Sequence, residues 1–154
     1  MGESNGRIPV AAVGAVVLPL RRGGSVTLRR IRSSVDIDIA QAARLRDGDT
    51  ASQMRWYQLR VRWAVRGASG LKYSDTGEPV AFALEHEQSL GTIASAAVYD
   101  ALDEADVADI LLVARGVLTV DDLERRRRVL AEGGTVEPVA AAAAETLSEG
   151  QAGN

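Results

Sequence analysis

The segment Thr50–Gly67, TASQMRWYQLRVRWAVRG, constrains the fold more than any other part of this sequence. Thr50 and Gln53 have the spacing of a capping box, in which two side chains satisfy the free amide groups at a helix start. Gly67 offers the left-handed residue with which helices commonly end. The pattern therefore predicts a helix over residues 51–66, and this helix holds both tryptophans of the chain.

This predicted helix is apolar on two opposite faces. At 100° per residue, Trp56, Leu59 and Trp63 gather on one face. The other face is formed by Met54, Tyr57, Val61, Ala64 and Val65.

Arginines mark the seams between the two faces. Arg55, Arg62 and Arg66 fall on one seam, and Arg60 lies near the other side of the tryptophan face. We expect their aliphatic stems to pack and their charged ends to stay in solvent.

Three interpretations of this helix follow. It could bind nucleic acid, lie between two layers of its own domain, or present the tryptophan face to another protein chain or copy. Because Trp and Arg dominate interface energetics, we predict a protein-binding surface. Its residues are Trp56, Leu59, Trp63, Arg55 and Arg62.

Composition sets limits on the function. A chain of 154 residues with 46% hydrophobic content is typical of one globular domain. Its 18 basic and 21 acidic residues give a net charge of −3, which disfavours the general attraction to nucleic acid on which most such binders rely. There is no cysteine, so disulfides, thiolate zinc sites and cysteine nucleophiles are excluded.

The N-terminal half predicts a β-hairpin followed by a short helix. Residues 15–20 and 25–31 are β-rich and flank the turn Arg21-Arg22-Gly23-Gly24. Val26 and Leu28 alternate with polar positions, which suits a small sheet with one face on helices. Residues 35–46 follow as a weakly amphipathic helix.

The second half predicts an irregular loop and three helices. Residues 74–77, Ser-Asp-Thr-Gly, form a turn between short extended pieces. A helix capped by Ser89 or Thr92 runs through residue 102, and residues 103–114 form the next one. Thr119 caps the last helix.

Charged residues outside the predicted helix at residues 51–66 are expected to be solvated. We predict this for Arg125–Arg128, for the acids of residues 100–109, and for His86, the only histidine. No nucleophile elbow, phosphate loop or dinucleotide fingerprint is present, so we predict no enzyme activity, no catalytic residue, no cofactor and no metal.

The fold class predicted is mainly α with a small N-terminal β-hairpin, an α+β domain. Residues 1–11 are expected to be a flexible N-terminus, 12–134 a single helical domain, and 135–154 a low-complexity mobile tail. The apolar run at residues 8–20 carries two prolines and is too short to span a membrane, which favours a cytoplasmic protein.

The order of these elements resembles the tail assembly chaperones of long-tailed bacteriophages. The resemblance covers roughly residues 12–132 and is carried by GAVVLPLRRGGSVTLRRI, the two helices after it, the loop YSDTGEPVAF, and SLGTIASAAVYDAL before a closing helix. In that loop, Asp75 to Phe82 resembles the family pattern D-x-G-x-P-V-x-F.

The resemblance implies a protein of the host cytoplasm that binds the tape-measure protein and helps recruit tail-tube subunits. Whether the chain forms a homo-oligomer is left open by the sequence. It also implies absence from the finished particle and, often, a longer product made by ribosomal frameshifting. Two alternatives remain: a structural virion protein such as a head-completion or connector component, and a small DNA-binding regulator that uses its arginines on phosphates.

Overall fold

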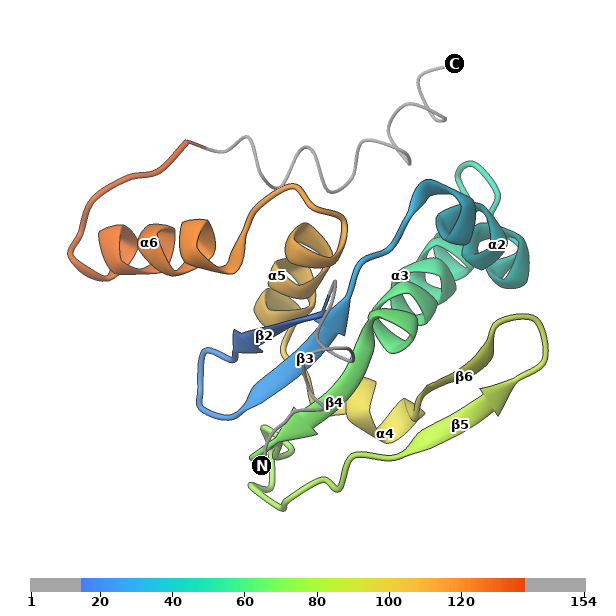
Figure 1. Cartoon of the computed structure of the whole chain (residues 1–154), viewed down its shortest axis with the longest axis horizontal. Helices are drawn as coiled ribbons and strands as arrows, with labels where there is room; N and C mark the ends of the chain where they lie inside the picture. Colours follow the sequence, from blue (N-terminus) through green and yellow to red (C-terminus); the bar gives the residue numbers. More distant parts are fainter. Residues whose placement is uncertain (1–14, 138–154) are drawn as a thin grey trace, which may run out of the picture.

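The computed structural model describes residues 15–137 and shows an α+β fold (Figure 1). Within this range the chain forms five helices, a three-stranded antiparallel sheet and a two-stranded antiparallel sheet. The predicted α+β class is confirmed in these terms. The predictions for residues 1–11 and for the tail beyond residue 137 lie outside the described residues.

The first sheet contains the predicted hairpin. Strand β2 (Ala15–Pro19) pairs with β3 (Ser25–Arg29), and Pro19 lies opposite Ser25 at the turn. Val26 and Leu28 are fully buried, as their alternation predicted. Strand β4 completes the sheet on the other side of β3, in the order β2-β3-β4.

Helix α3 (Thr50–Ala64) continues directly into β4 (Val65–Ser69). The helix was predicted, but its capping box is wrong, because Asp49 is the N-cap and no side chain caps it. The stop at Gly67 is also wrong, since Gly67 lies in β4 opposite Thr27. Pairing with β3 satisfies the backbone groups that another helical turn would have used.

Helix α2 (Ser33–Ala43) connects β3 to α3 and packs on α3. It corresponds to the predicted helix at residues 35–46, starting and ending earlier. Arg44 ends it in the left-handed conformation, with φ 54°.

The chain then forms a small loop and the second sheet. The predicted turn is present, since Tyr73 N donates to Glu78 O and Gly77 N to Tyr73 O. Strands β5 (Leu84–Glu87) and β6 (Gly91–Ala94) follow as a hairpin. His86 is exposed on β5 rather than in a loop.

The helix predicted from Ser89 or Thr92 is therefore wrong in its first part, because that segment pairs as a β-hairpin. Helix α4 (Ala96–Asp100) is shorter and is capped by Ser95, whose side chain accepts a hydrogen bond from Val98 N.

Two more helices complete the described chain. Helix α5 (Glu104–Ala114) and helix α6 (Val120–Ala131) lie close to their predicted positions. Thr119 caps α6 as predicted, and Asp122 returns the second hydrogen bond of a capping box.

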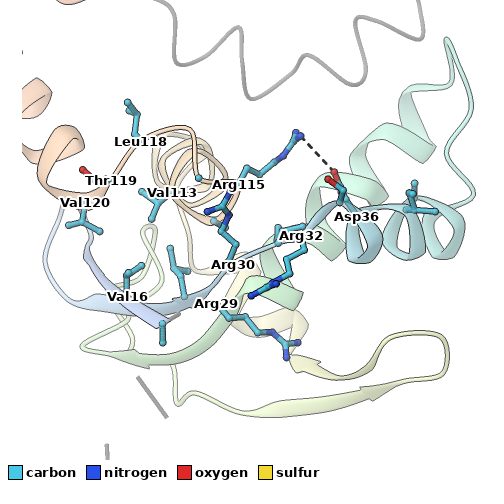
Figure 2. Close-up of a pocket in the computed structure, with 18 of the residues that line it drawn as sticks. Val16, Arg29, Arg30, Arg32, Asp36, Val113, Arg115, Leu118, Thr119 and Val120 are labelled. Carbon is cyan, nitrogen blue, oxygen red and sulfur yellow. Dashed lines mark ion pairs between the residues drawn. The ribbon is translucent and has the colours of Figure 1, made fainter. Parts of the chain in front are cut away.

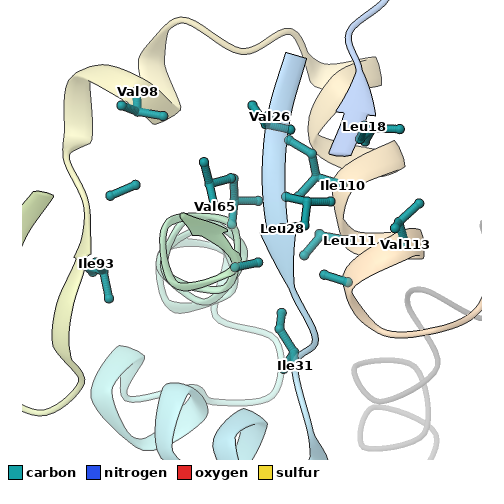
Figure 3. Packing of buried hydrophobic residues seen from close by; sticks show 14 of the residues in the cluster. Leu18, Val26, Leu28, Ile31, Val65, Ile93, Val98, Ile110, Leu111 and Val113 are labelled. Atoms are coloured by element: carbon teal, nitrogen blue, oxygen red, sulfur yellow. The ribbon is translucent and has the colours of Figure 1, made fainter. Parts of the chain in front are cut away.

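The hydrophobic core is built around β3, with α5 on one side and the α3–β4 segment on the other (Figure 3). Its fully buried side chains come from every layer, which explains how short strands and helices form one domain. They include Leu18, Val26, Leu28, Trp56, Val65, Ile93 and Ile110.

Candidate functional site

The tryptophan face of α3 lies in the interior. Trp56 is 0% exposed, Leu59 is 9% exposed and Trp63 is half-buried. Trp56 and Leu59 belong to the same core cluster as Ile93 of β6 and Val98 of α4. The described chain thus buries Trp56 and Leu59 in its own core, so the prediction that these two side chains meet a partner is wrong.

The predicted arginines of α3 bind backbone carbonyls of neighbouring elements. Arg62 Nε donates to Ala94 O at 2.7 Å, and its Nη2 donates to Glu85 Oε1 at 2.8 Å. Arg55 Nε donates to Ala43 O at 3.2 Å. These hydrogen bonds join α3 to β5, β6 and α2. The expectation of solvated charged ends is wrong for Arg62, whose side chain is only 14% exposed, and for Arg60, whose side chain is 0% exposed.

Arg60 is the most unusual residue of the helix, because its charged side chain is 0% exposed. Its guanidinium lies over the Trp56 ring at 4.0 Å from the centroid, a cation–π contact. Arg60 Nε is 3.1 Å from Asp36 Oδ1 without hydrogen-bond alignment, whereas Nη2 donates to Asp36 Oδ2 at 3.3 Å. Asp36 therefore supplies the counter-charge, from a helix 24 residues earlier in the chain.

Burial also affects the titration of Arg60. It lowers the pKa of Arg60 to about 10, and the attraction of Asp36 offsets only part of that effect. Arg115 is a second cation beside the same carboxylate, 3.9 Å from Asp36 Oδ2. One carboxylate thus balances two guanidinium groups.

A second cluster of charged side chains connects the β2–β3 hairpin to helices α5 and α6. Asp109 is 3% exposed and accepts from Arg21 Nε at 2.9 Å and from Arg127 Nη2 at 2.7 Å. Arg127 Nη1 also donates to Pro19 O at 2.8 Å. Asp106 is buried beside them, and burial raises its pKa. The predictions that these acids and Arg127 are solvated are wrong, because they bridge β2, α5 and α6.

One concave surface of the described chain is a groove of about 1670 Å³. It lies between β2 and β3, helix α2, and the connection from α5 to α6 (Figure 2). Drug-sized ligands occupy pockets of about 300–1,000 Å³. A groove of this size suits a segment of polypeptide better than a small molecule.

Exposed aliphatic side chains gather in this groove. Val16 is 41% exposed, Val17 56% and Ile37 59%, and all three line it. Among the described residues, the other large hydrophobic side chains exposed to this degree are Met54, Leu84 and Leu130. Val16 and Val17 are consecutive in β2, so their side chains point to opposite faces of the sheet, and Val16, which pairs with the groove-lining Leu28, shares the groove with Ile37 of α2.

The groove is also rich in positive charge. It is lined by five arginines and two aspartates, namely Arg29, Arg30, Arg32, Arg44, Arg115, Asp36 and Asp121. In Figure 2, Arg115 reaches toward Asp36 across the groove, whereas Arg29 points the other way. Arg29 lies over the Trp63 ring at 3.6 Å and donates to Trp63 O, and burial lowers its pKa to about 10.

Reasoning from the sequence missed this groove, because its lining comes from four separate segments. The available signals were the adjacent Val16 and Val17 on a hairpin strand, and Arg30 and Arg32 flanking the apolar Ile31. Ile31 is buried while the two arginines beside it are exposed, which is the alternation of a half-buried extended segment.

Two other kinds of feature are absent from residues 15–137. No group of three His, Cys, Asp or Glu side chains there could hold a metal ion. No helix in the same range is long and apolar enough to cross a membrane.

Comparisons of the chain with protein-family models, with curated proteins and with solved structures gave no match.

Proposed function

We propose that this protein is a tail assembly chaperone of a long-tailed bacteriophage, acting without catalysis or a cofactor in the host cytoplasm. Its clients are the tape-measure protein, which it binds, and the tail-tube subunits, which it helps recruit. The resemblance in residues 12–132 supports the family, and the groove between β2, β3, α2 and the α5–α6 connection supports binding of a protein segment.

The groove is the observation that carries this proposal. Its exposed aliphatic side chains would be covered by a bound segment, which is the gain that drives most protein association. Complete burial of an exposed Val or Ile side chain is worth about 1.5–3 kcal/mol, so covering the exposed part of Val16 or Ile37 is worth roughly half of that for each. We therefore assign the client surface to the hairpin and α2, and not to the tryptophan face of α3.

The experiment is capture of the tape-measure protein of the same phage by the tagged full-length chain. The test variant combines Val16→Asp and Ile37→Asp. Because both side chains are exposed, at 41% and 59%, the variant should remain folded. Met54→Asp is the matched control, since Met54 is 65% exposed on α3 and does not line the groove.

We expect the groove variant to lose the tape-measure protein and Met54→Asp to retain it. Equal capture by both would refute the assignment of the groove. Mass spectrometry of purified particles separates the structural alternative, because a virion component would be found there in stoichiometric amounts. Sedimentation of the purified chain tests the accompanying proposal that it self-associates.

A further inference from the structure

Three arginines of the groove have no partner among the residues that the structure describes. Arg30, Arg32 and Arg44 are exposed, and no ion pair or hydrogen bond links their side chains to any residue in the range 15–137. Many surface arginines are solvated in this way, but these three line one concave surface together with exposed aliphatic groups. The chain as a whole carries a net charge of −3, so the positive charge of the groove is opposite in sign to the charge of the whole protein.

Arg44 also occupies a backbone conformation that favours glycine. Its φ of 54° makes it the one non-glycine residue with positive φ in the described range. A left-handed residue at a helix end is commonly glycine, and other residues there carry strain. The left-handed conformation is that of a helix C-cap, and it places the Arg44 side chain in the lining of the groove.

Arg30 is positioned by a glycine of the opposite wall. Gly116 has a φ of 76°, and a Cβ there would overlap the Arg30 guanidinium. The charged end of Arg30 thus lies directly on the backbone between α5 and α6, close to the aliphatic side of the groove. An arginine held against a wall loses less freedom on binding than one in open solvent.

We propose that the groove binds an acidic segment of a partner protein that also carries aliphatic side chains. The aliphatic groups would lie on Val16 and Ile37, and the carboxylates would face Arg30, Arg32 and Arg44. This inference rests on the proposed function and specifies the client segment. Nucleic acid fits less well, because Asp36 and Asp121 line the same groove and its floor is aliphatic.

The uncapped start of α2 adds to this match. Arg32 is the N-cap of α2 and its side chain makes no capping hydrogen bond. The positive end of the helix dipole therefore lies beside the exposed arginines and favours negative charge in the same place.

The test uses two labelled synthetic peptides with the same Leu and Ala positions in an amphipathic pattern. One carries Glu at every charged position and the other carries Lys. Fluorescence anisotropy measures the binding of each to the full-length chain at low and high salt. A duplex DNA probe and a peptide of residues 135–154, which contain Glu137, Glu145 and Glu149 and no basic residue, are measured in parallel.

The charge variant is Arg30→Glu with Arg32→Glu. Its matched control is Arg46→Glu with Arg128→Glu, which changes the net charge equally at two exposed arginines that do not line the groove. We expect the Glu peptide to bind in a salt-sensitive manner, the Lys peptide not to bind, and the charge variant to weaken binding about tenfold or more. The control should stay within about threefold.

Arg44→Gly separates binding from folding. We expect this variant to bind the Glu peptide more weakly than the parent chain does. Its thermal unfolding midpoint should stay at or above that of the parent chain, because glycine relieves the strain. If Arg44 were purely structural, peptide binding would not change. That result would remove Arg44 from the proposal.

Four outcomes would overturn the inference: no binding of the Glu peptide, equal loss in both double variants, DNA bound more tightly than the Glu peptide, or the peptide of residues 135–154 saturating the groove so that no partner segment competes. Capture of the tape-measure protein distinguishes the two proposals. If capture persists in Arg30→Glu with Arg32→Glu, the proposed function stands and the acidic segment fails. If the parent chain does not capture the tape-measure protein but binds the Glu peptide in the groove, the acidic segment stands and the proposed function fails.

Discussion

Replacement of Asp36 by alanine should destabilise the protein severely, because it leaves the buried Arg60 without its counter-charge. The Arg60 side chain is 0% exposed and that of Asp36 is 8% exposed, so solvent cannot replace the carboxylate. Removing one partner of a buried ion pair costs about 3–5 kcal/mol. Arg115 then adds repulsion, since it faces the same carboxylate and already contributes to the lowered pKa of Arg60.

A loss of this size would be a large part of the stability of the domain, for which about 5–15 kcal/mol is typical. Urea unfolding followed by tryptophan fluorescence measures it, and Trp56 reports on the site directly because Arg60 lies over its ring. The control is Asp38→Ala, on the same helix and exposed, for which we expect a change within about 0.5 kcal/mol.

The double variant Asp36→Ala with Arg60→Met tests the cause. Removing both charges avoids the unpaired buried cation, so the double variant should be more stable than Asp36→Ala alone. The reasoning is refuted if Asp36→Ala costs less than about 1 kcal/mol, which is the scale of exposed ion pairs. It is also refuted if the loss in the double variant equals the sum of the losses in Asp36→Ala and Arg60→Met measured singly.

Three further predictions concern the hairpin and the last two helices. Thr119→Ala should cost about 1 kcal/mol in urea unfolding because α6 loses its cap, and Thr119→Ser should restore most of it. Gly24→Ala should destabilise the protein by more than the about 1–2 kcal/mol that a left-handed non-glycine residue costs, because its Cβ would lie 2.7 Å from the carbonyl oxygen of Gly70. In the control Gly23→Ala the Cβ meets nothing within 4 Å, so equal losses of stability in the two variants would contradict the steric argument. Asp106→Asn should stabilise the protein at neutral pH, since burial raises the pKa of this carboxyl and its ionised form opposes folding, while Asn can still accept the backbone hydrogen bond. This gain should fade as the pH falls toward 3.8, the ordinary value, and urea midpoints measured across that range check it; a variant less stable at neutral pH would contradict it.

Local chemistry was sufficient to predict the elements whose signals lie within a few residues. The turn at residues 21–24 between two β-rich segments gave the first hairpin, and Thr119 with two acids after it gave the start of α6. Gly77 closed the predicted turn before β5, with a φ of 74°. In each case the hydrogen bonds that define the element join residues close in sequence, so composition and spacing decide them.

Local patterns failed where a distant segment competed for the same backbone. Val65 and Arg66 continue the helical pattern of α3, yet they join β4 because β3 offers hydrogen-bond partners from residues 25–28. Residues 91–94 were predicted to start a helix and instead pair with β5. Intrinsic propensity is a weak preference, and tertiary pairing overrides it.

The sequence by itself thus determined that two apolar faces and several arginines lie on one long helix. Only the tertiary structure decided that Trp56 and Leu59 are buried in the core, and that Arg60 is buried against a carboxylate of α2. The groove was decided in the same way, since Val16, Arg30, Ile37 and Gly116 come together only when the sheet, α2 and the α5–α6 connection pack. Periodicity shows which side chains share a face, but burial depends on which surface that face meets.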